Sequence, residues 1–334
     1  MNSQFPTYGL SELRTALLRK DMLSVVRDAF IRHAQSGVVA PEPGELLFSD
    51  PPGDCHIKFG YFKGGAVFVV KLAIGFYENP MKGLDTNNGL VLVFDAKTGK
   101  TIAVLNDEGW LTSWRTAAAG ALAAKAGAPS SVTALGIIGT GHQAELQARW
   151  ASESLGTQRV VIWGRDLAKS ARLANNLSQQ GLTAMAVKDV GELFAQCNVV
   201  ITCTPATAPL VPAAMVRPGT HIVAMGADSV GKQELDPNIF ARATVIMTDD
   251  HAQCLGHGEF CHAVTAGLVS STADISLGQV LAGQARGRLS EEDITIVDLT
   301  GLAAQDVAIA TLAIELIQSR SIEGGRKASE GTHR

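Results

Sequence analysis

The chain has 334 residues, 46% of them hydrophobic and 18% charged, which is enough apolar material for a sizeable core and excludes fibrous, disordered and disulfide-scaffold proteins. At about 100–200 residues per domain, this length predicts roughly two domains. The 28 Lys and Arg against 32 Asp and Glu give a net charge of -4, which excludes the whole-protein basic field that nucleic acid or an anionic membrane requires.

Membrane spans and export are not expected. The longest apolar stretches fall far short of the roughly 20 residues that cross a bilayer. The N-terminal segment carries charges where a signal peptide has its apolar region. Five cysteines without a CxxC pair are typical of reduced thiols. We therefore predict a cytoplasmic protein that binds neither membranes nor nucleic acid.

The N-terminal part is predicted to contain one helix and then an antiparallel sheet. Residues Ser11 to Ala34 carry apolar side chains at helical spacing, with Ser11 as N-cap. From Ile57 to Val104, short β-type runs are separated by Gly and Asn, and Asp95 to Gly99 has the composition of a hairpin turn. A long Ala-rich helix follows, from near Thr112 to near Gly127.

After Pro129 the chain changes to alternating apolar strands and helices, which predicts a parallel sheet with helices on both faces. The strands are expected at 132–138, 160–163, 199–203, 221–225, 244–248 and 294–299. A final helix is expected over 302–318. The polar, Gly-rich tail, residues 324–334, is predicted to be disordered.

The strongest local motif is a glycine-rich turn between a strand and a helix, Gly139-Thr140-Gly141-His142-Gln143-Ala144. It has the GxGxxA form of the dinucleotide fingerprint, in which Gly139 permits the tight turn and Gly141 lets the backbone approach a pyrophosphate. Ala144 lets helix and strand pack closely. The alternative is an ordinary Gly-rich turn, but the position between strand and helix favours a dinucleotide site. We predict that all six residues bind the cofactor.

The residues that follow the strand predicted at 160–163, the second strand after Pro129, indicate which cofactor is bound. NAD-selective sites usually place an acidic residue there, whereas here Gly164 and Arg165 come first and Asp166 follows. Arg165 can pair with the 2′-phosphate of NADP, although a solvated arginine at a helix start is the alternative. We predict NAD(P)H as cofactor, with NADP favoured over NAD and with Arg165 and Asp166 in contact with it. The remaining predicted cofactor contacts are Thr116, Thr204 and Thr300.

Three charged residues are candidates for a substrate site. Lys71 lies in an apolar strand, where an ammonium group is costly unless it meets an anion; an outward-facing lysine is the alternative. Arg115, at the head of the Ala-rich helix, could hold a carboxylate or pair with a nearby acid. Asp228 follows a parallel strand at the edge where such sheets bind ligands, so it is either a catalytic carboxylate or a helix N-cap.

A run of cysteines and histidines superficially resembles a metal site. It comprises His251, Cys254, His257, Cys261 and His262. Its spacing is not one of the common structural zinc patterns. The spacing is better explained if these side chains lie on helix faces or in loops and do not all face one point. We therefore predict no metal.

Six segments together resemble the ornithine cyclodeaminase and mu-crystallin family of dehydrogenase-like enzymes: VKLAIGFYENP, NGLVLVFDAKTGKTIAVL, GWLTSWRTAAAGALAA, GIIGTGHQA, GADSVGKQELDP and VDLTGLAAQD. The resemblance runs from about Val38 to about Leu316. It implies an α/β homodimer in which a Rossmann-type dinucleotide-binding domain, residues 129–301, is inserted into a mixed α+β domain. That second domain, for dimerisation and substrate binding, would comprise residues 1–128 and be completed by 302–323.

The resemblance also implies roles for single residues. Lys71 matches the lysine near the substrate, Arg115 the arginine that holds the amino acid carboxylate, and Asp228 the catalytic aspartate. In one departure, many members carry a further arginine after the segment corresponding to Val38–Pro41, whereas this chain has none there. Lys58, on the next strand, is the predicted replacement and makes a plain ornithine substrate less favoured.

The family's common step is hydride exchange between nicotinamide and the α-carbon of an amino acid or its imine, so Lys71 and Asp228 are the predicted catalytic residues. The leading hypothesis is an NAD(P)H-dependent imine (ketimine or imino acid) reductase that produces an L-amino acid, which Arg165 favours. One alternative is an ornithine cyclodeaminase-type lyase that uses catalytic NAD+ and releases ammonia. Another is a non-catalytic protein that binds NADPH or a small ligand, as mu-crystallin suggests.

Overall fold

The computed structural model describes residues 5–330, and the chain divides into two compact units. One unit takes in Met1–Arg115 with Ala303–Arg334, and the other is Thr116–Leu302. The first division falls inside helix α3 (Trp110–Gly127) and not after it, where the sequence pattern changes. One continuous helix therefore contributes residues to both units.

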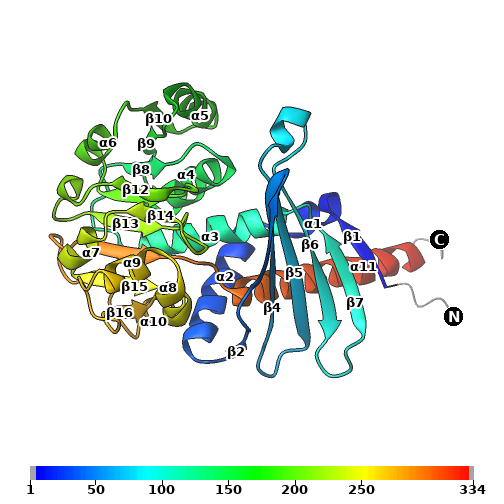
Figure 1. The fold of residues 1–334 in the computed structure, drawn as a ribbon. Helices are drawn as coiled ribbons and strands as arrows, with labels where there is room; N and C mark the ends of the chain where they lie inside the picture. Colours follow the sequence, from blue (N-terminus) through cyan, green and yellow to red (C-terminus); the bar gives the residue numbers. More distant parts are fainter. Residues whose placement is uncertain (1–4, 331–334) are drawn as a thin grey trace. The chain divides into compact units, whose positions relative to one another are not determined.

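Seven of the described strands form the sheet of the first unit (Figure 1). Its centre is a run of antiparallel neighbours, β4 (Pro52–Phe62), β5 (Val67–Phe76), β6 (Asn87–Asp95) and β7 (Thr101–Asn106). The edges are β1 (Thr7–Gly9), parallel to β7, and β2 (Val38–Val39) and β3 (Gly44–Ser49), both antiparallel to β4. A short 3-10 helix, η1 (Asn79–Lys82), lies between β5 and β6. The antiparallel sheet predicted between Ile57 and Val104 is confirmed.

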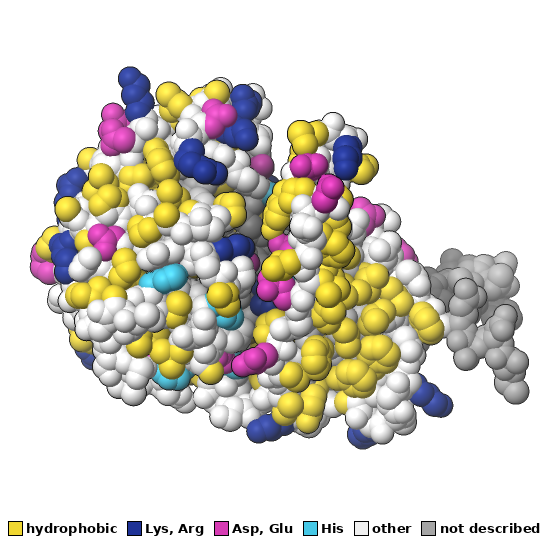
Figure 2. Space-filling model, in the orientation of Figure 1, with side chains coloured by type: hydrophobic (Ala, Val, Ile, Leu, Met, Phe, Trp, Pro, Cys, Tyr) yellow, Lys and Arg dark blue, Asp and Glu magenta, His cyan; other side chains and the backbone are white. Residues whose placement is uncertain are grey.

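The two faces of this sheet differ in burial. Buried and partly exposed side chains alternate along β5 and β6, as expected when one face is covered. On the opposite face, the rings of Phe68 and Phe94 stack with their centroids 4.8 Å apart, and Phe59 and Tyr61 are 38% and 39% exposed. Figure 2 shows hydrophobic side chains gathered over these strands. The sheet thus presents an apolar face that the chain itself leaves partly exposed.

The predicted helix over residues 11–34 is wrong in one respect, since it is two helices. α1 (Leu10–Ala16) and α2 (Arg19–Ala34) are separated by Leu17 and Leu18, whose backbones are extended. Ser11, the predicted N-cap, lies inside α1. Because Leu17 stays buried across the break, the apolar spacing does not reveal it.

Helix α11 (Ala303–Glu330) returns to the first unit and contacts α2, β4 and β5. It continues beyond the predicted end at residue 318 and through residues 324–330, where disorder is predicted. Gly324 and Gly325 cost about 1 kcal/mol each in a helix, but the residues after them are mostly good helix formers. Residues 331–334 of the predicted tail lie outside the described residues.

The second unit is built on eight parallel strands among the described residues, in the order β10-β9-β8-β11-β13-β17-β15-β16. Their bounds are β8 (Leu135–Ile138), β9 (Arg159–Trp163), β10 (Thr183–Ala186), β11 (Val199–Thr202), β13 (His221–Ala224), β15 (Val245–Thr248), β16 (Asp274–Ser276) and β17 (Thr295–Asp298). The order reverses at β8, which lies between β9 and β11. This reversal is the switch point at which open α/β sheets bind ligands, and the predicted Rossmann-type architecture is confirmed.

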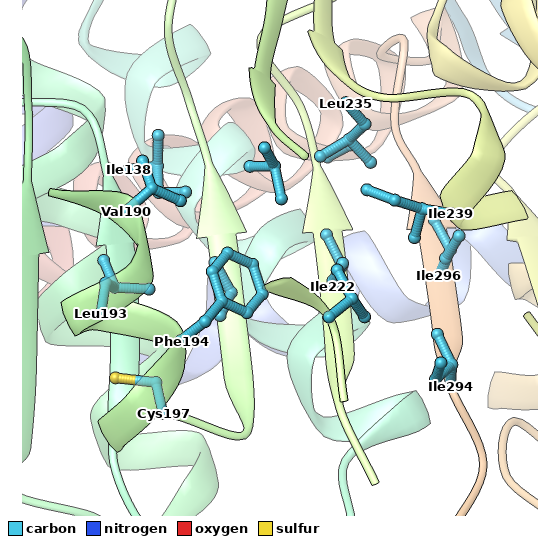
Figure 3. Packing of buried hydrophobic residues seen from close by; sticks show 14 of the residues in the cluster. Ile138, Val190, Leu193, Phe194, Cys197, Ile222, Leu235, Ile239, Ile294 and Ile296 are labelled. Atoms are coloured by element: carbon cyan, nitrogen blue, oxygen red, sulfur yellow. The ribbon is translucent and has the colours of Figure 1, made fainter. Parts of the chain in front are cut away.

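Helices and a small two-stranded sheet complete this unit: α4 (His142–Leu155), α5 (Leu167–Gln179), α6 (Val190–Gln196), α7 (Asn238–Arg242), α8 (His251–Gly256), α9 (Glu259–Thr265), α10 (Leu277–Leu281), η2 (Ala213–Met215), and β12 (Thr207–Val211) paired with β14 (Gln233–Leu235). Apolar side chains such as Leu193, Phe194 and Ile222 pack between strands and helices (Figure 3). No helix within residues 5–330 is both long and apolar enough to cross a membrane.

Candidate active site

The turn between β8 and α4 has the geometry of a phosphate-binding loop. Gly139 has a φ of 137°, and a Cβ placed there would lie 3.0 Å from the carbonyl oxygen of Cys203, so this position requires glycine. At Gly141, no described heavy atom outside the adjoining residues Thr140 and His142 lies within 4 Å of a Cβ position. Gly141 is also the N-cap of α4 and supplies no side-chain acceptor to its first N–H groups. The loop is therefore open at a helix N-terminus, where an anion such as a pyrophosphate can bind.

Two of the predicted cofactor contacts, Thr116 and Gln143, accept hydrogen bonds from Gln147, a residue that the motif does not include. Gln147 is buried in α4, and its Nε2 donates to the carbonyl oxygen of Thr116 at 3.0 Å and to Oε1 of Gln143 at 3.4 Å. Ala144 is fully buried, Thr140 and Gln143 are half-buried, and His142 is exposed. Gln147 thus joins the phosphate-binding turn to α3.

Arg165 and Asp166 lie at the end of β9, beside this turn. Arg165 is exposed. Asp166 is the N-cap of α5, and its Oδ1 accepts hydrogen bonds from the N–H groups of Ala168 at 2.9 Å and Lys169 at 3.1 Å. Arg165 therefore presents its guanidinium to solvent, while Asp166 is engaged with the helix that follows.

The two remaining predicted cofactor contacts have different surroundings. Thr204 is half-buried, and Glu234 accepts hydrogen bonds from both its N–H and its hydroxyl. Thr300 is fully buried, and its N–H and hydroxyl each donate to Asp249 at 3.0 Å. Thr300 therefore links the end of β15 to the chain after β17.

The predicted substrate residues of the first unit form one buried cluster. Lys71 and Arg115 are only 2% and 7% exposed, so the outward-facing alternative for Lys71 is wrong. Lys71 Nζ lies 2.8 Å from Oδ2 of Asp306, and Arg115 Nε lies 3.2 Å from Oδ1 of the same carboxylate. Arg115 Nη1 donates to Oε1 of Gln305 at 3.0 Å, which leaves Gln305 Nε2 without a hydrogen-bond partner among the described residues. This buried donor requires an acceptor that the described chain does not supply.

The cluster carries an excess of positive charge. Lys58 is half-buried and pairs directly with Lys71 in the register of β4 and β5, so their side chains share a face. Burial, together with the charge of Arg115, lowers the pKa of Lys71 to about 7. Burial alone would raise the pKa of Asp306, but the nearby cations hold it below its ordinary value. Such a site favours a ligand that brings a carboxylate.

A second carboxylate, Asp107, lies near this cluster at the start of α3. Its Oδ2 accepts a hydrogen bond from the N–H of Leu111 at 2.7 Å. Burial raises the pKa of Asp107 to about 6, an effect that backbone hydrogen bonds and Lys71 oppose. Asp107 thus orders the helix that carries Arg115, and cationic groups still outnumber acidic groups around Lys71.

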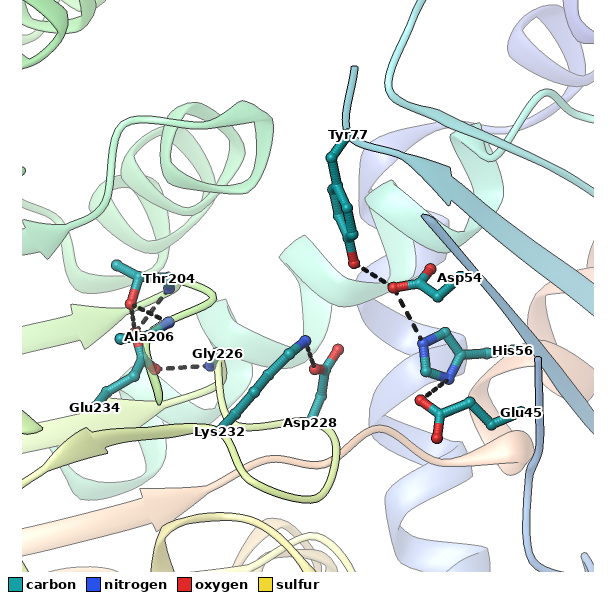
Figure 4. Close-up of polar contacts among 10 residues, drawn as sticks. All are labelled: Glu45, Asp54, His56, Tyr77, Thr204, Ala206, Gly226, Asp228, Lys232 and Glu234. Carbon is teal, nitrogen blue, oxygen red and sulfur yellow. Dashed lines mark hydrogen bonds and ion pairs between the residues drawn. The ribbon is translucent and has the colours of Figure 1, made fainter. Parts of the chain in front are cut away.

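A further polar group, which the sequence did not reveal, comprises Glu45, Asp54, His56 and Tyr77 (Figure 4). His56 is two residues from Lys58 and so lies on the same face of β4. Its ring nitrogens lie 3.8 Å from Oε1 of Glu45 and 3.7 Å from Oδ2 of Asp54, and the Tyr77 hydroxyl donates to Asp54. An acidic and aromatic group therefore adjoins the cationic cluster.

Asp228 lies in the connection between β13 and β14 (Figure 4). Its side chain is 49% exposed, and Lys232 Nζ donates to its Oδ1 at 2.6 Å. The next helix in the described chain is α7, which follows Pro237. The N-cap alternative is therefore wrong, and the carboxylate is an exposed group at the carboxyl edge of the parallel sheet.

The cysteines and histidines between residues 251 and 262 contact separate partners. His251 Nδ1 lies 2.8 Å from Oδ1 of Asp274, and His262 Nε2 donates to the carbonyl oxygen of Lys232 at 2.9 Å. Cys254 is fully buried. Among residues 5–330, no group of three or more His, Cys, Asp or Glu side chains is arranged to hold a metal ion.

Comparison with known proteins relates the whole chain to one family. Residues 10–321 match the family model described as the ornithine cyclodeaminase/mu-crystallin family. A protein of Sinorhizobium fredii described as an uncharacterized cyclodeaminase is 38% identical over 316 residues, which cover 93% of this chain and 95% of that protein. The iminosuccinate reductase of Paracoccus denitrificans is 38% identical over 266 residues, which cover 78% and 82% respectively.

Two solved structures share the fold over nearly their full length. An archaeal alanine dehydrogenase dimer with bound NAD superposes with a TM-score of 0.86 at 32% identity, covering 95% of this chain and 97% of that one. The Paracoccus denitrificans iminosuccinate reductase in complex with NAD+ has a TM-score of 0.84 at 31% identity, covering 95% and 98%.

Proposed function

Because the chain belongs to the ornithine cyclodeaminase/mu-crystallin family, we propose that it is an NAD(P)H-dependent reductase that converts a small imino acid into an L-amino acid. The observation that carries this proposal is the buried cationic cluster of Lys71 and Arg115, where a substrate carboxylate would bind. The names of two relatives, an iminosuccinate reductase and an alanine dehydrogenase, support chemistry at the α-carbon of an amino acid.

The residues present fit a dinucleotide cofactor. The open backbone at Gly141 and the uncapped start of α4 would hold the pyrophosphate, and the bound cofactor would supply the hydride for the imine carbon. Arg115 would hold the substrate carboxylate with its planar guanidinium, and Lys71 would add charge to the same contact. Asp228 would deliver the proton to the imine nitrogen, or hold a water that does so.

The charge of the cluster also bears on the substrate class. Lys58 adds a third cation beside Lys71, and Gln305 Nε2 adds a buried donor without a partner among the described residues. These groups would suit an imine that carries a second acidic group, as an iminosuccinate-type compound does. The cyclodeaminase alternative is retained because the Sinorhizobium fredii relative bears that description.

A substrate panel tests the proposal. Iminosuccinate-type and cyclic imino acids, pyruvate with ammonium, and ornithine would each be assayed with NADH and with NADPH, following nicotinamide absorbance and ammonium release. A reductase consumes the reduced cofactor stoichiometrically. Release of ammonium from ornithine with catalytic NAD+ would establish the cyclodeaminase instead. Cofactor binding without turnover of any compound would establish the ligand-binding alternative.

Arg165 would favour NADP over NAD. Arg165→Asp is expected to weaken NADPH binding by roughly 2–4 kcal/mol, because a charge-assisted contact with the 2′-phosphate becomes a repulsion, and to change NADH binding much less. Fluorescence titration of both cofactors measures the two affinities. Arg172→Asp, which changes another exposed arginine on the following helix, is the matched control. Equal losses for both cofactors would contradict the assignment.

Lys71 should give the reaction a pH dependence near neutrality. The protonated ammonium attracts the substrate carboxylate, and with a pKa of about 7 it loses its charge as the pH rises. We therefore expect kcat/KM, which reports the free enzyme, to fall with increasing pH above about 7. In Lys71→Arg the side chain stays positively charged, so this decrease of kcat/KM above pH 7 should disappear even if overall activity is lower. If kcat/KM of the variant still decreased above pH 7, another group would be responsible for the pH dependence.

The apolar face of the first unit's sheet supports a homodimer. Phe59, Tyr61, Phe68 and Phe94 share this face and are partly exposed. A contiguous apolar surface of this kind marks an association site, and the archaeal relative is described as a dimer. We propose that two copies pair through this face. Light scattering should give twice the 35.0 kDa mass of the chain.

A further inference from the structure

Glu234, in β14, is a buried carboxylate that accepts hydrogen bonds from four donors. Figure 4 shows its contacts with Thr204 and Gly226. Its Oε1 accepts from the N–H of Thr204 at 2.7 Å and from the Thr204 hydroxyl at 2.8 Å. Its Oε2 accepts from the hydroxyl of Thr202 at 2.6 Å and from the N–H of Gly226 at 2.8 Å. Each oxygen thus binds one backbone N–H and one hydroxyl.

These donors belong to two separate segments. Thr204 follows β11 and Gly226 follows β13, and these strands are parallel neighbours in the sheet. Both segments therefore leave the carboxyl edge, where open α/β sheets bind ligands. Thr204 is a predicted cofactor contact, and Asp228 lies two residues beyond Gly226. The Glu234 side chain therefore joins the segment that contains Thr204 to the segment that carries Asp228.

Gly226 lies too close to Glu234 and to the Thr204 backbone for a larger residue to replace it. A Cβ placed on Gly226 would lie 2.5 Å from Oε2 of Glu234 and 2.2 Å from the carbonyl oxygen of Thr204. Since real side chains cannot approach backbone this closely, any substitution of Gly226 has to separate the two segments. Gly226, two residues before Asp228, is therefore required by the close approach of both the Thr204 backbone and the Glu234 carboxylate.

The strand that carries Glu234 is itself fixed by α9. Glu259 accepts hydrogen bonds from the N–H groups of Glu234 at 2.5 Å and Leu235 at 3.0 Å. His262, from the same helix, donates to the carbonyl oxygen of Lys232. The segment that carries Asp228 is thus held at its start through Gly226 and at its end through Lys232, which also pairs with Asp228.

We propose that Glu234 is a positioning residue for the reduction, fixing the Thr204 segment and the Asp228 segment relative to each other. It touches neither substrate nor reacting atoms in this assignment and acts through the two segments. The inference rests on the proposed function, since it takes Asp228 as the proton donor and Thr204 as a cofactor contact.

Glu234→Gln is the discriminating variant. The amide keeps one oxygen, so in either orientation an NH2 group faces a backbone N–H, from Thr204 or from Gly226, and one segment is released. We expect kcat to fall by about 10- to 100-fold, because small displacements of catalytic groups have effects of this size. The KM for the imine should change little, since its carboxylate would bind to Arg115. Cofactor affinity is measured by fluorescence titration with NADH and NADPH.

Asp236→Asn is the matched control. Asp236 follows β14 directly, and its carboxylate accepts hydrogen bonds from the N–H groups of Asn238 at 2.9 Å and Ala213 at 3.2 Å, away from both segments. Asparagine keeps one of the two oxygens, so the loss of the hydrogen bond to the other oxygen should lower thermal stability without changing kcat. Gly226→Ala, which leaves every carboxylate in place, should reproduce the kcat loss of Glu234→Gln.

The outcomes separate this inference from the proposed function. If Glu234→Gln loses stability as Asp236→Asn does but keeps wild-type kcat and cofactor affinity, the inference is overturned. If the wild type binds NADH or NADPH but reduces no imine, the proposed function is wrong. The cofactor affinity of Glu234→Gln, compared with that of the wild type, then tests only whether Glu234 positions Thr204. If Glu234→Gln does not fold, Thr202→Val, which removes one of the four donors at constant shape, should still show a smaller fall in kcat; no fall would overturn the inference.

Discussion

Asp228→Asn is expected to lower turnover by about 10²- to 10⁴-fold while substrate and cofactor still bind. Asparagine keeps the size of the side chain and can still accept a hydrogen bond from Lys232, but it has no proton to transfer. Because this carboxylate is half-exposed, its loss should cost little folding stability. Single-turnover oxidation of NADPH or NADH with the imine identified by the panel separates the chemical step from binding.

Lys232→Gln provides the comparison for this variant. It removes the ion-pair partner at 2.6 Å but leaves the Asp228 carboxylate in place, so its effect on turnover should be much smaller. If Asp228→Asn retained near wild-type turnover, the proton would have to come from Lys71 or from water, and Asp228 would be only a partner of Lys232.

Asp306→Asn should produce the largest loss of stability. Removing one partner of a buried ion pair costs about 3–5 kcal/mol, because the remaining charge is left in a poorly solvated site. Here the remaining charges are Lys71 and Arg115, both nearly inaccessible to solvent. Urea unfolding followed by circular dichroism measures the change, provided that both units unfold in one transition or are resolved separately.

The pH dependence of this loss supplies an internal check. Asp306 raises the pKa of Lys71 against the larger opposing effect of burial, so its removal lowers that pKa further. As the pH rises from that lowered pKa to about 7, the folded variant has lost the Lys71 proton, whereas the folded wild type and both unfolded chains still bind it. The stability of the variant therefore rises relative to that of the wild type and the deficit shrinks in this range, and above about 7 it stays constant. Adding Lys71→Met to Asp306→Asn should recover part of the loss. A deficit below about 1 kcal/mol would show that the two cations are not held by Asp306.

The fold was predictable because its strands carry strong local signals. The buried parallel strand β8 is an uninterrupted apolar run, and β11 is apolar up to Thr202, whereas the antiparallel strands alternate around glycines. The break at Leu17 was not predictable, since both sides of it bury apolar residues at compatible spacing. Periodicity reports which side chains are buried, not whether the helix between them is continuous.

The candidate site was predictable only where a residue conflicts with its neighbours. Lys71 stands out as a charge in an apolar strand, but Asp306 is one acidic residue in the first turn of a helix, where such residues are common. Its contact with Arg115 spans 191 residues and has no local signature. Glu234 is hidden for a similar reason, because its partners come from two other strand ends.

Helix α11 has a consequence for the order in which the protein folds on the ribosome. Strand β5 and Arg115 emerge long before residue 306, so during translation two cations that are buried in the finished protein have no carboxylate to receive them. The second unit, continuous from Thr116 to Leu302, emerges complete before α11 and can fold as a unit. We therefore expect nascent chains to contain a folded second unit tethered to a sheet that α11 does not yet cover, and this uncovered sheet exposes apolar side chains and strand edges that favour aggregation.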